Sequence, residues 1–309
     1  MAGTARAWTV AVTGASGLVG SALVSDLTSA GHRVLRLVRG AGATAGAGER
    51  TARWDPESGA LEPSALAGVD AVVHLAGESV AGGRWTEAKK RRIRSSRVDA
   101  TRRLAGVLAR LPCPPRVLVV ASATGYYGDR GPELLREESA SGAGFLAEVC
   151  REWEAATDPA ARAGIRVVRL RIGMVLSRRG GALAAMLTPF RLGVGGPIGG
   201  GAQWVSWIAL DDLVRAIRHA LATDALAGVV NAVAPEPVTN RELARTLGRV
   251  LGRPALLPLP AVAARLVFGQ MANELLLASA RVDPARLRAT GFTFAYARLE
   301  DALRHELGR

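Results

Sequence analysis

The chain has 309 residues, of which 49% are hydrophobic, so it is long enough to bury a core as one large domain or two. Its hydrophobic runs are short and interrupted by charge, and none reaches the roughly 20 residues that span a bilayer, which excludes a transmembrane protein. Because the first residues lead directly into an apolar run, we expect no cleavable signal segment. We therefore expect a cytoplasmic protein with no membrane partner.

The net charge of +13 comes almost entirely from arginine, since the only lysines are Lys89 and Lys90. The densest basic run, residues 89–97, lies where an amphipathic helix is expected and contains no aromatic residue on which a base would stack. A solvated helix face explains it better than a nucleic-acid site, and a phosphorylated cofactor would account for other arginines. We expect no nucleic-acid partner.

The cysteine and histidine content points away from disulfides and metals. Cys113 and Cys150 are expected to be free thiols in an intracellular chain. The four histidines are scattered and show no metal-ligand spacing. We expect no metal site.

Strand-like and helix-like segments alternate through the first 235 residues. Strands are predicted over residues 9–12, 32–38, 51–54, 70–76, 116–121, 166–170 and 229–233, with helices over residues 21–30, 87–111, 145–163 and 213–221. Residues 40–50 are rich in glycine and alanine and are predicted to form a loop. This alternation predicts an α/β fold with a doubly wound, parallel, Rossmann-type sheet and helices on both of its faces.

The pattern becomes irregular after Gly173, and residues 193–201 are too rich in glycine for regular structure. The chain beyond residue 235 is mostly helical. We predict a dinucleotide-binding domain over residues 8–234, with a substrate-lobe insertion at about residues 178–210. A smaller C-terminal lobe is expected over residues 235–309.

Three glycines follow the first predicted strand at intervals of three residues. Gly14 suits a tight turn, Gly17 lets the backbone approach a pyrophosphate, and Gly20 lets the following helix pack closely on the sheet. The N-terminus of that helix offers unpaired N–H groups to the phosphates. We predict that this turn binds a dinucleotide through the three glycines and through Ser16, Leu18 and Val19.

The end of the second strand indicates which dinucleotide is bound. A protein that selects NAD places an acid here for the ribose 2′-hydroxyl, whereas this sequence has Val38 followed by Arg39. A guanidinium at this position would pair with the 2′-phosphate of NADP. The alternative is that Arg39 is one of many surface arginines. We predict NADP as the cofactor.

Several motifs together resemble a known family. The glycine turn, the strand end that reads His74-Leu-Ala-Gly77 and the stretch Ala121-Ser-Ala-Thr-Gly-Tyr-Tyr-Gly128 are similar to an extended short-chain dehydrogenase/reductase. More narrowly, the chain resembles NAD-dependent epimerase family proteins with an uncharacterised C-terminal domain. The supporting stretches span nearly the whole chain: Leu75-Ala-Gly-Glu-Ser79, Arg84-Trp85, Ser96-Arg97, residues 186–193, residues 228–235, Pro258-Leu-Pro260 and residues 274–279.

The resemblance implies further cofactor contacts. Leu75, Ala76 and Gly77 should approach the adenosine and ribose. Arg97 and Arg171 match arginines associated with NADP in this family. For Arg97, a solvated helix face is the alternative.

The sequence departs from the family in its catalytic residues. Ordinary members use a Tyr-x-x-x-Lys relay, in which tyrosine transfers a proton and lysine lowers the pKa of that tyrosine. Here both lysines precede all three tyrosines, and the helix that should carry the relay begins Gly144-Phe-Leu-Ala-Glu-Val-Cys150. The tyrosine and lysine positions are therefore apolar or occupied by a thiol.

Replacement proton donors or acceptors are Tyr126, Ser122 and Glu78, and for each a purely structural role is an equal alternative. Cys150 is interpreted as an inert buried thiol and His74 as a core histidine. Two function classes remain open. One is an NADP(H)-dependent oxidoreductase or epimerase acting on an unknown small molecule, with a homodimer as an option. The other is a non-catalytic NADP(H)-binding sensor or scaffold.

Overall fold

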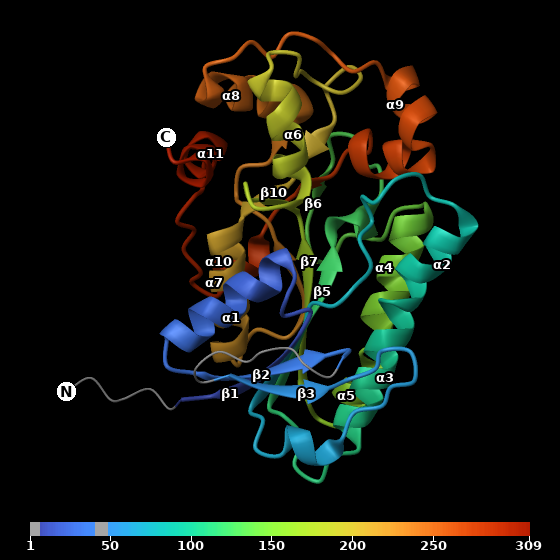
Figure 1. Ribbon diagram of the computed structural model, residues 1–309, viewed down its shortest axis with the longest axis vertical. Coiled ribbons are helices and arrows are strands. Elements are labelled where there is room, and N and C mark those ends of the chain that lie inside the picture. The colour runs from blue at the N-terminus through green and yellow to red at the C-terminus, as the bar shows by residue number, and fades with distance from the viewer. Residues whose placement is uncertain (1–6, 41–48) are drawn as a thin grey trace, which may run out of the picture.

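The computed structural model describes residues 7–40 and 49–309, so most of the predicted loop at residues 40–50 lies outside the described residues. Its centre is a seven-stranded sheet in the order β11-β7-β5-β4-β1-β2-β3, and every pair in it is parallel (Figure 1). The predicted α/β, doubly wound fold is confirmed. The strands of this sheet are β1 (Thr9–Thr13), β2 (Arg33–Val38), β3 (Glu49–Arg53), β4 (Ala71–His74), β5 (Val117–Ala123), β7 (Arg166–Ile172) and β11 (Gly228–Ala232).

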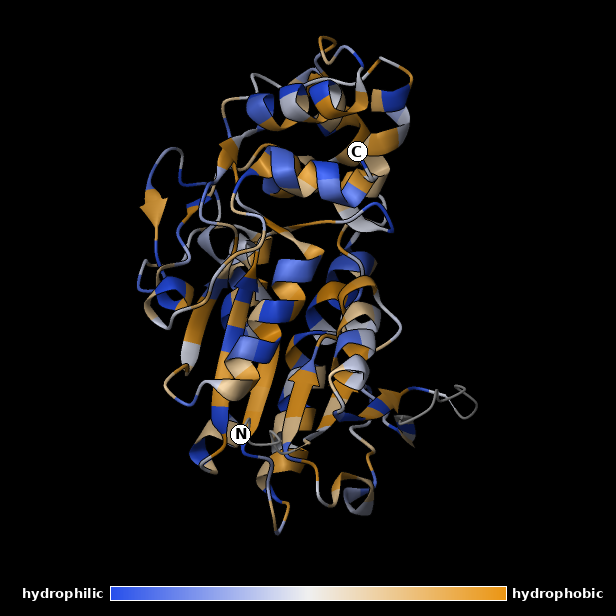
Figure 2. Cartoon of the chain, turned by 90° about the vertical axis from the view of Figure 1, so that its left-hand side faces the viewer, coloured by the Kyte–Doolittle hydropathy of each residue, from blue (hydrophilic) through white to orange (hydrophobic). Residues whose placement is uncertain are grey.

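Helices cover both faces of the sheet because its strands are apolar on both sides. Val10 and Val12 of β1 face a core shared with α1 (Leu18–Ser29) and α7 (Leu210–Ala222). Ala11 faces a second core with α3 (Val98–Ala109), α4 (Phe145–Ala155) and α5 (Asp158–Arg162). Figure 2 shows hydrophobic residues along the sheet strands and hydrophilic residues on the outward faces of the covering helices. Burial on both faces is typical of parallel strands.

The prediction of a single helix over residues 87–111 is wrong, because the chain forms two helices there, α2 (Glu87–Ser95) and α3. The hydroxyl of Ser96 donates to the Ile93 carbonyl and accepts the Glu78 N–H. A serine that bonds to nearby backbone competes with regular helical bonding. The break therefore lies at Ser96–Arg97.

The helix predicted over residues 145–163 is likewise divided into α4 and α5. Pro159 has no N–H to donate, and it lies at the start of α5, where that group is not needed. The Thr157 hydroxyl donates to the Glu154 carbonyl and so satisfies one of the last carbonyls of α4. The division is thus encoded by these two residues.

Most of the remaining elements form a lobe above the carboxyl ends of the sheet strands (Figure 1), whereas η1 precedes β4 at the opposite end of the sheet and α10 packs against β11. One hydrophobic cluster joins α6, α8 and α11, so the predicted insertion packs on the C-terminal segment. None of the described helices is long and apolar enough to cross a membrane. The elements are β6 (Leu134–Leu135), β8 (Met174–Leu176), α6 (Gly181–Arg191), β9 (Trp204–Val205), β10 (Trp207–Ala209), β12 (Val238–Thr239), α8 (Asn240–Leu251), α9 (Ala261–Phe268), β13 (Arg281–Val282), α10 (Ala285–Ala289) and α11 (Leu299–Leu307), with the short helical turns η1 (Pro63–Leu66), η2 (Thr124–Tyr127) and η3 (Ala272–Leu276).

Candidate functional site

The glycine turn joins β1 to α1 through backbone that only glycine accommodates. Gly14 has a φ of 67°, and a Cβ there would lie 2.8 Å from the carbonyl carbon of Leu75. A Cβ on Gly20 would collide with the carbonyl of Gly14. The ends of β1 and β4 and the start of α1 meet because side chains are absent at these positions.

The start of α1 has the properties of an anion site. Its N-cap, Gly17, has no side chain to bond the first N–H groups, and the first turn contains no acidic residue. Ser16 and Gly17 are exposed, and Leu18 and Val19 are partly buried behind them. Unpaired N–H groups and the positive end of the helix dipole therefore face outward, which fits the pyrophosphate of a dinucleotide.

A buried hydrogen-bond pair fixes the strand end beside this turn. The Thr13 hydroxyl accepts the N–H groups of Leu75 and Ala76, each at 3.2 Å, and lies 2.7 Å from Nδ1 of His74. Since its oxygen accepts both amides, the hydroxyl proton points to Nδ1. His74 is fully buried and structural, while Gly77 is exposed at the edge of the site.

Stability should fall in acid because of His74. Burial lowers its pKa from 6.5 to about 4, so the unfolded chain binds a proton between these values that the folded chain does not. The associated stability is present above pH 6.5 and is lost progressively as the pH falls towards 4, by roughly 3 kcal/mol. Urea unfolding between pH 7 and 4.5 should show this slope. The dependence of the unfolding free energy on pH should be weaker in His74→Gln and unchanged in the control His305→Asn. An unchanged pH dependence in His74→Gln would contradict the assignment to His74.

Two predicted cofactor arginines lie near this edge, one exposed and the other half-buried. Arg39 follows Val38 at the end of β2 and is exposed, next to the strand that leads into the glycine turn. Arg97 lies at the break between α2 and α3, and the position of a Cβ on Gly77 would be 3.3 Å from its Cζ. Its guanidinium also lies 5.2 Å from the ring centroid of Trp153, and burial lowers its pKa. The fold therefore brings Arg97 to the predicted ribose-contacting strand end.

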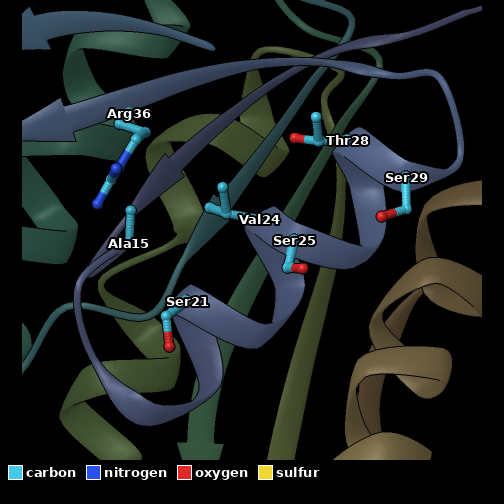
Figure 3. Close-up of a pocket in the computed structure, with 7 residues that line it drawn as sticks. All are labelled: Ala15, Ser21, Val24, Ser25, Thr28, Ser29 and Arg36. Carbon is cyan, nitrogen blue, oxygen red and sulfur yellow. The ribbon is translucent and has the colours of Figure 1, made fainter. Parts of the chain in front are cut away.

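A pocket of about 330 Å³ lies along α1 (Figure 3). Hydroxyls from successive turns of α1 line it, together with Ala15 and Arg36. It begins beside the glycine turn, at Ala15 and at Ser21 in the first turn of α1, and extends along the helix to Ser29, so it adjoins the predicted pyrophosphate cradle.

Arg171 is fully engaged within the protein. It is 2% exposed, and its Nε and Nη2 donate to the two carboxylate oxygens of Glu154 at 2.8 and 2.9 Å. Although burial opposes its charge, this carboxylate holds the pKa of Arg171 above its usual value. The predicted contact of Arg171 with NADP does not fit this placement, since its donors already have acceptors.

Ser122 belongs to the same buried group. It is 3% exposed, and its hydroxyl donates to Glu154 at 2.7 Å. The prediction that Ser122 handles a substrate proton therefore does not fit its placement. It acts on Glu154 instead.

Two adjacent tyrosines on η2 differ sharply in environment. The Tyr127 hydroxyl is buried, accepts from Arg171 and lies 2.7 Å from Oδ1 of Asn231, and burial raises the pKa of Tyr127 to about 12. Tyr126 is partly exposed, and its ring centroid lies 3.3 Å from Cζ of Arg171. Among the described residues, no partner bonds the Tyr126 hydroxyl. Of the predicted proton donors, Tyr126 alone combines an accessible hydroxyl with a cation against its ring.

Glu78 is held in an ion pair with Lys89, with Oε1 and Nζ 2.6 Å apart. The hydrogen bond from Lys89 lowers the pKa of Glu78, so its carboxylate stays ionised near neutral pH. In this state it can accept a proton but cannot donate one.

A residue of the C-terminal lobe caps the N-terminus of α4, the helix that lacks the customary relay. Glu274 accepts the N–H groups of Phe145 and Leu146 at 3.2 and 2.7 Å. Farther along α4, burial raises the pKa of the Cys150 thiol to about 12, which keeps it protonated and unreactive. The predicted inert thiol fits this environment.

Sequence reasoning did not identify Glu154 or Glu274 as part of the site. Glu154 shares the buried face of α4 with Leu146, Cys150 and Trp153. A carboxylate on an otherwise apolar helix face was a usable signal, because such a charge needs a partner. Glu274 gave no signal, since its partners lie 128 and 129 residues away.

These features define a dinucleotide-binding α/β protein, and comparison with known proteins gives its family. The NAD dependent epimerase/dehydratase family matches residues 10–232, and a domain of unknown function, DUF1731, matches residues 259–306. The chain belongs to this epimerase family, within the short-chain dehydrogenase/reductases.

The similar proteins match over nearly the full chain. An epimerase family protein of Mycobacterium bovis is 44% identical over 95% of this chain and 96% of its own. Human epimerase family protein SDR39U1 is 38% identical over 96% of this chain and 98% of its own. The crystal structure of the human protein with NADPH covers 97% of this chain and 99% of its own, with a TM-score of 0.86 and 35% identity.

Proposed function

We propose that this protein binds NADP(H) and transfers a hydride to or from an unknown small molecule, as an oxidoreductase or an epimerase. The observation that carries the proposal is the uncapped, acid-free start of α1 behind the glycine turn, with exposed Arg39 at the next strand end. The human relative described with NADPH supports the choice of cofactor.

When bound, the nicotinamide ring would supply or accept the hydride. The chain's own part is to hold the pyrophosphate at Gly14, Gly17 and Gly20 and the 2′-phosphate at Arg39. Tyr126 would give the proton to the reduced oxygen, and the Arg171 guanidinium, 3.3 Å from its ring centroid, holds the ring in position. A panel of carbonyl compounds and sugar nucleotides, followed by NADPH oxidation at 340 nm, tests for this turnover.

A second function is favoured by one observation. Where a proton relay is expected, α4 has the apolar residues Phe145, Leu146 and Val149 and the Cys150 thiol, which stays protonated. Glu148, in the first turn, is exposed and pairs with Arg94. A non-catalytic NADP(H)-binding sensor or scaffold would need no relay. Tight NADPH binding without turnover on the whole panel would favour this function over the enzyme.

Replacing Arg39 should separate the two cofactors. In Arg39→Ala, NADPH binding should weaken roughly 10- to 100-fold, because one charge-assisted contact with the 2′-phosphate is lost. NADH binding should change little, as measured by calorimetric titration. Arg102→Ala, which removes an exposed arginine of α3, serves as the control. Equal losses for NADPH and NADH would contradict the assignment of Arg39.

A further inference from the structure

Most of the large apolar side chains that are exposed lie at one end of the molecule. Of the ten such side chains that are at least 37% exposed in the described residues, nine lie on α9, on η3, on the loop after α6 or on the loop before α9. We call this surface the apolar end. Its residues are Leu192, Val194, Leu256, Leu257, Leu259, Val262, Leu266, Val267 and Leu275, with exposures from 37% to 80%.

The apolar end is one continuous surface. The loop after α6 runs beside the loop before α9, because Leu259 donates to the Pro197 carbonyl and accepts from the Gly199 N–H. A Cβ on Gly196 would collide with the backbone of Leu257, so the two loops touch. In Figure 1 the second loop crosses the top of the molecule from α8 to α9.

The orientation of α9 is the reverse of that expected for a helix that only packs on a core. Its fully buried residue is the small Ala264, whereas Val262, Leu266 and Val267 are 66%, 71% and 57% exposed. Helices of globular proteins normally turn such residues inward. Contiguous exposed apolar surface of this kind marks an interaction site.

The charges around the apolar end are mostly positive, and Glu274, the acid beside Leu275 on η3, is engaged by the N–H groups of Phe145 and Leu146. No aspartate or glutamate occurs from residue 243 to residue 273, nor from residue 159 to residue 210. Arg191, Arg253 and Arg265 are exposed, and none of them forms an ion pair within the described part of the chain. A second copy docked here about a two-fold axis would bring these arginines of both copies to one interface, and the segments that carry them contain no acid to pair with them.

We propose that the apolar end docks on an anionic lipid surface. Leucine and valine side chains would enter the boundary between headgroups and acyl chains, and the three arginines would contact lipid phosphates. This attachment is peripheral, and it goes beyond the proposed function. It also replaces the expectation of no membrane partner, which rested only on the lack of a spanning segment.

Sedimentation with lipid vesicles tests the proposal. Wild-type protein should sediment with vesicles of equal phosphatidylglycerol and phosphatidylcholine at low salt, and much less with phosphatidylcholine alone. Leu256→Ser with Leu266→Ser should lower the partition coefficient at least about tenfold, because apolar surface no longer leaves water. Arg253→Gln with Arg265→Gln should lower it roughly thirtyfold, and raising the salt should mimic that change.

Leu134→Ser is the matched control, because Leu134 is 45% exposed but lies outside the apolar end. It should sediment like wild type, and thermal unfolding should show that every variant is folded. Wild-type protein that stays in the supernatant with anionic vesicles would overturn the proposal. So would a dimer, seen by light scattering, that Leu256→Ser with Leu266→Ser separates, because a second copy would then cover this surface.

Discussion

Tyr126→Phe should lower turnover by about 10²- to 10⁴-fold and leave NADPH affinity unchanged. Proton transfer by a positioned side chain contributes on this scale, and phenylalanine keeps the ring while removing the proton. Arg171 lies against the ring face and not at the hydroxyl, so the packing on its guanidinium should survive the change. Rates on whichever panel substrate is turned over, with calorimetric titration of NADPH, measure both effects.

Tyr127→Phe is the matched control for this experiment. The Tyr127 hydroxyl is buried between Arg171 and Asn231, so its loss should reduce stability by about 1–3 kcal/mol and leave the proton-transfer step intact. If Tyr127→Phe abolishes turnover while Tyr126→Phe retains it, the proton does not come from Tyr126. Retained turnover in both variants would exclude both tyrosines.

Glu154→Ala should cost about 3–5 kcal/mol of unfolding free energy, because it leaves the Arg171 guanidinium buried without its carboxylate. Glu154→Gln keeps one acceptor and should lose less. Urea unfolding at pH 7 measures the difference from wild type.

Glu152→Ala provides the control on the same helix. Glu152 pairs with Arg94 at the surface, where both side chains are about 40% exposed, so its removal should cost less than about 1 kcal/mol. Equal, small losses in Glu154→Ala and Glu152→Ala would show that the buried pair does not hold the strand and helix together.

The sheet and the cofactor turn could be predicted because their signals are local. Runs of apolar residues such as residues 70–76 indicate strands buried on both faces, and β4 lies within that range. The spacing of Gly14, Gly17 and Gly20 specifies a turn that no other residue accommodates. Local periodicity did not show where helices divide, since the Ser96 hydroxyl competes with backbone bonds that the pattern alone leaves intact.

The sequence by itself therefore determined the fold class, the dinucleotide turn, the position of Arg39 and the loss of the customary relay. The tertiary structure decided which polar groups are free to act. Ser122 and Arg171 donate hydrogen bonds to Glu154, and Glu78 forms an ion pair with Lys89. The Tyr126 hydroxyl has no such partner among the described residues, while the Tyr126 ring contacts Arg171. The physical reason is that a side chain's availability depends on partners supplied by other elements. Ser122 is 32 residues from Glu154 in the chain, and the distance between them is set by packing and not by local pattern.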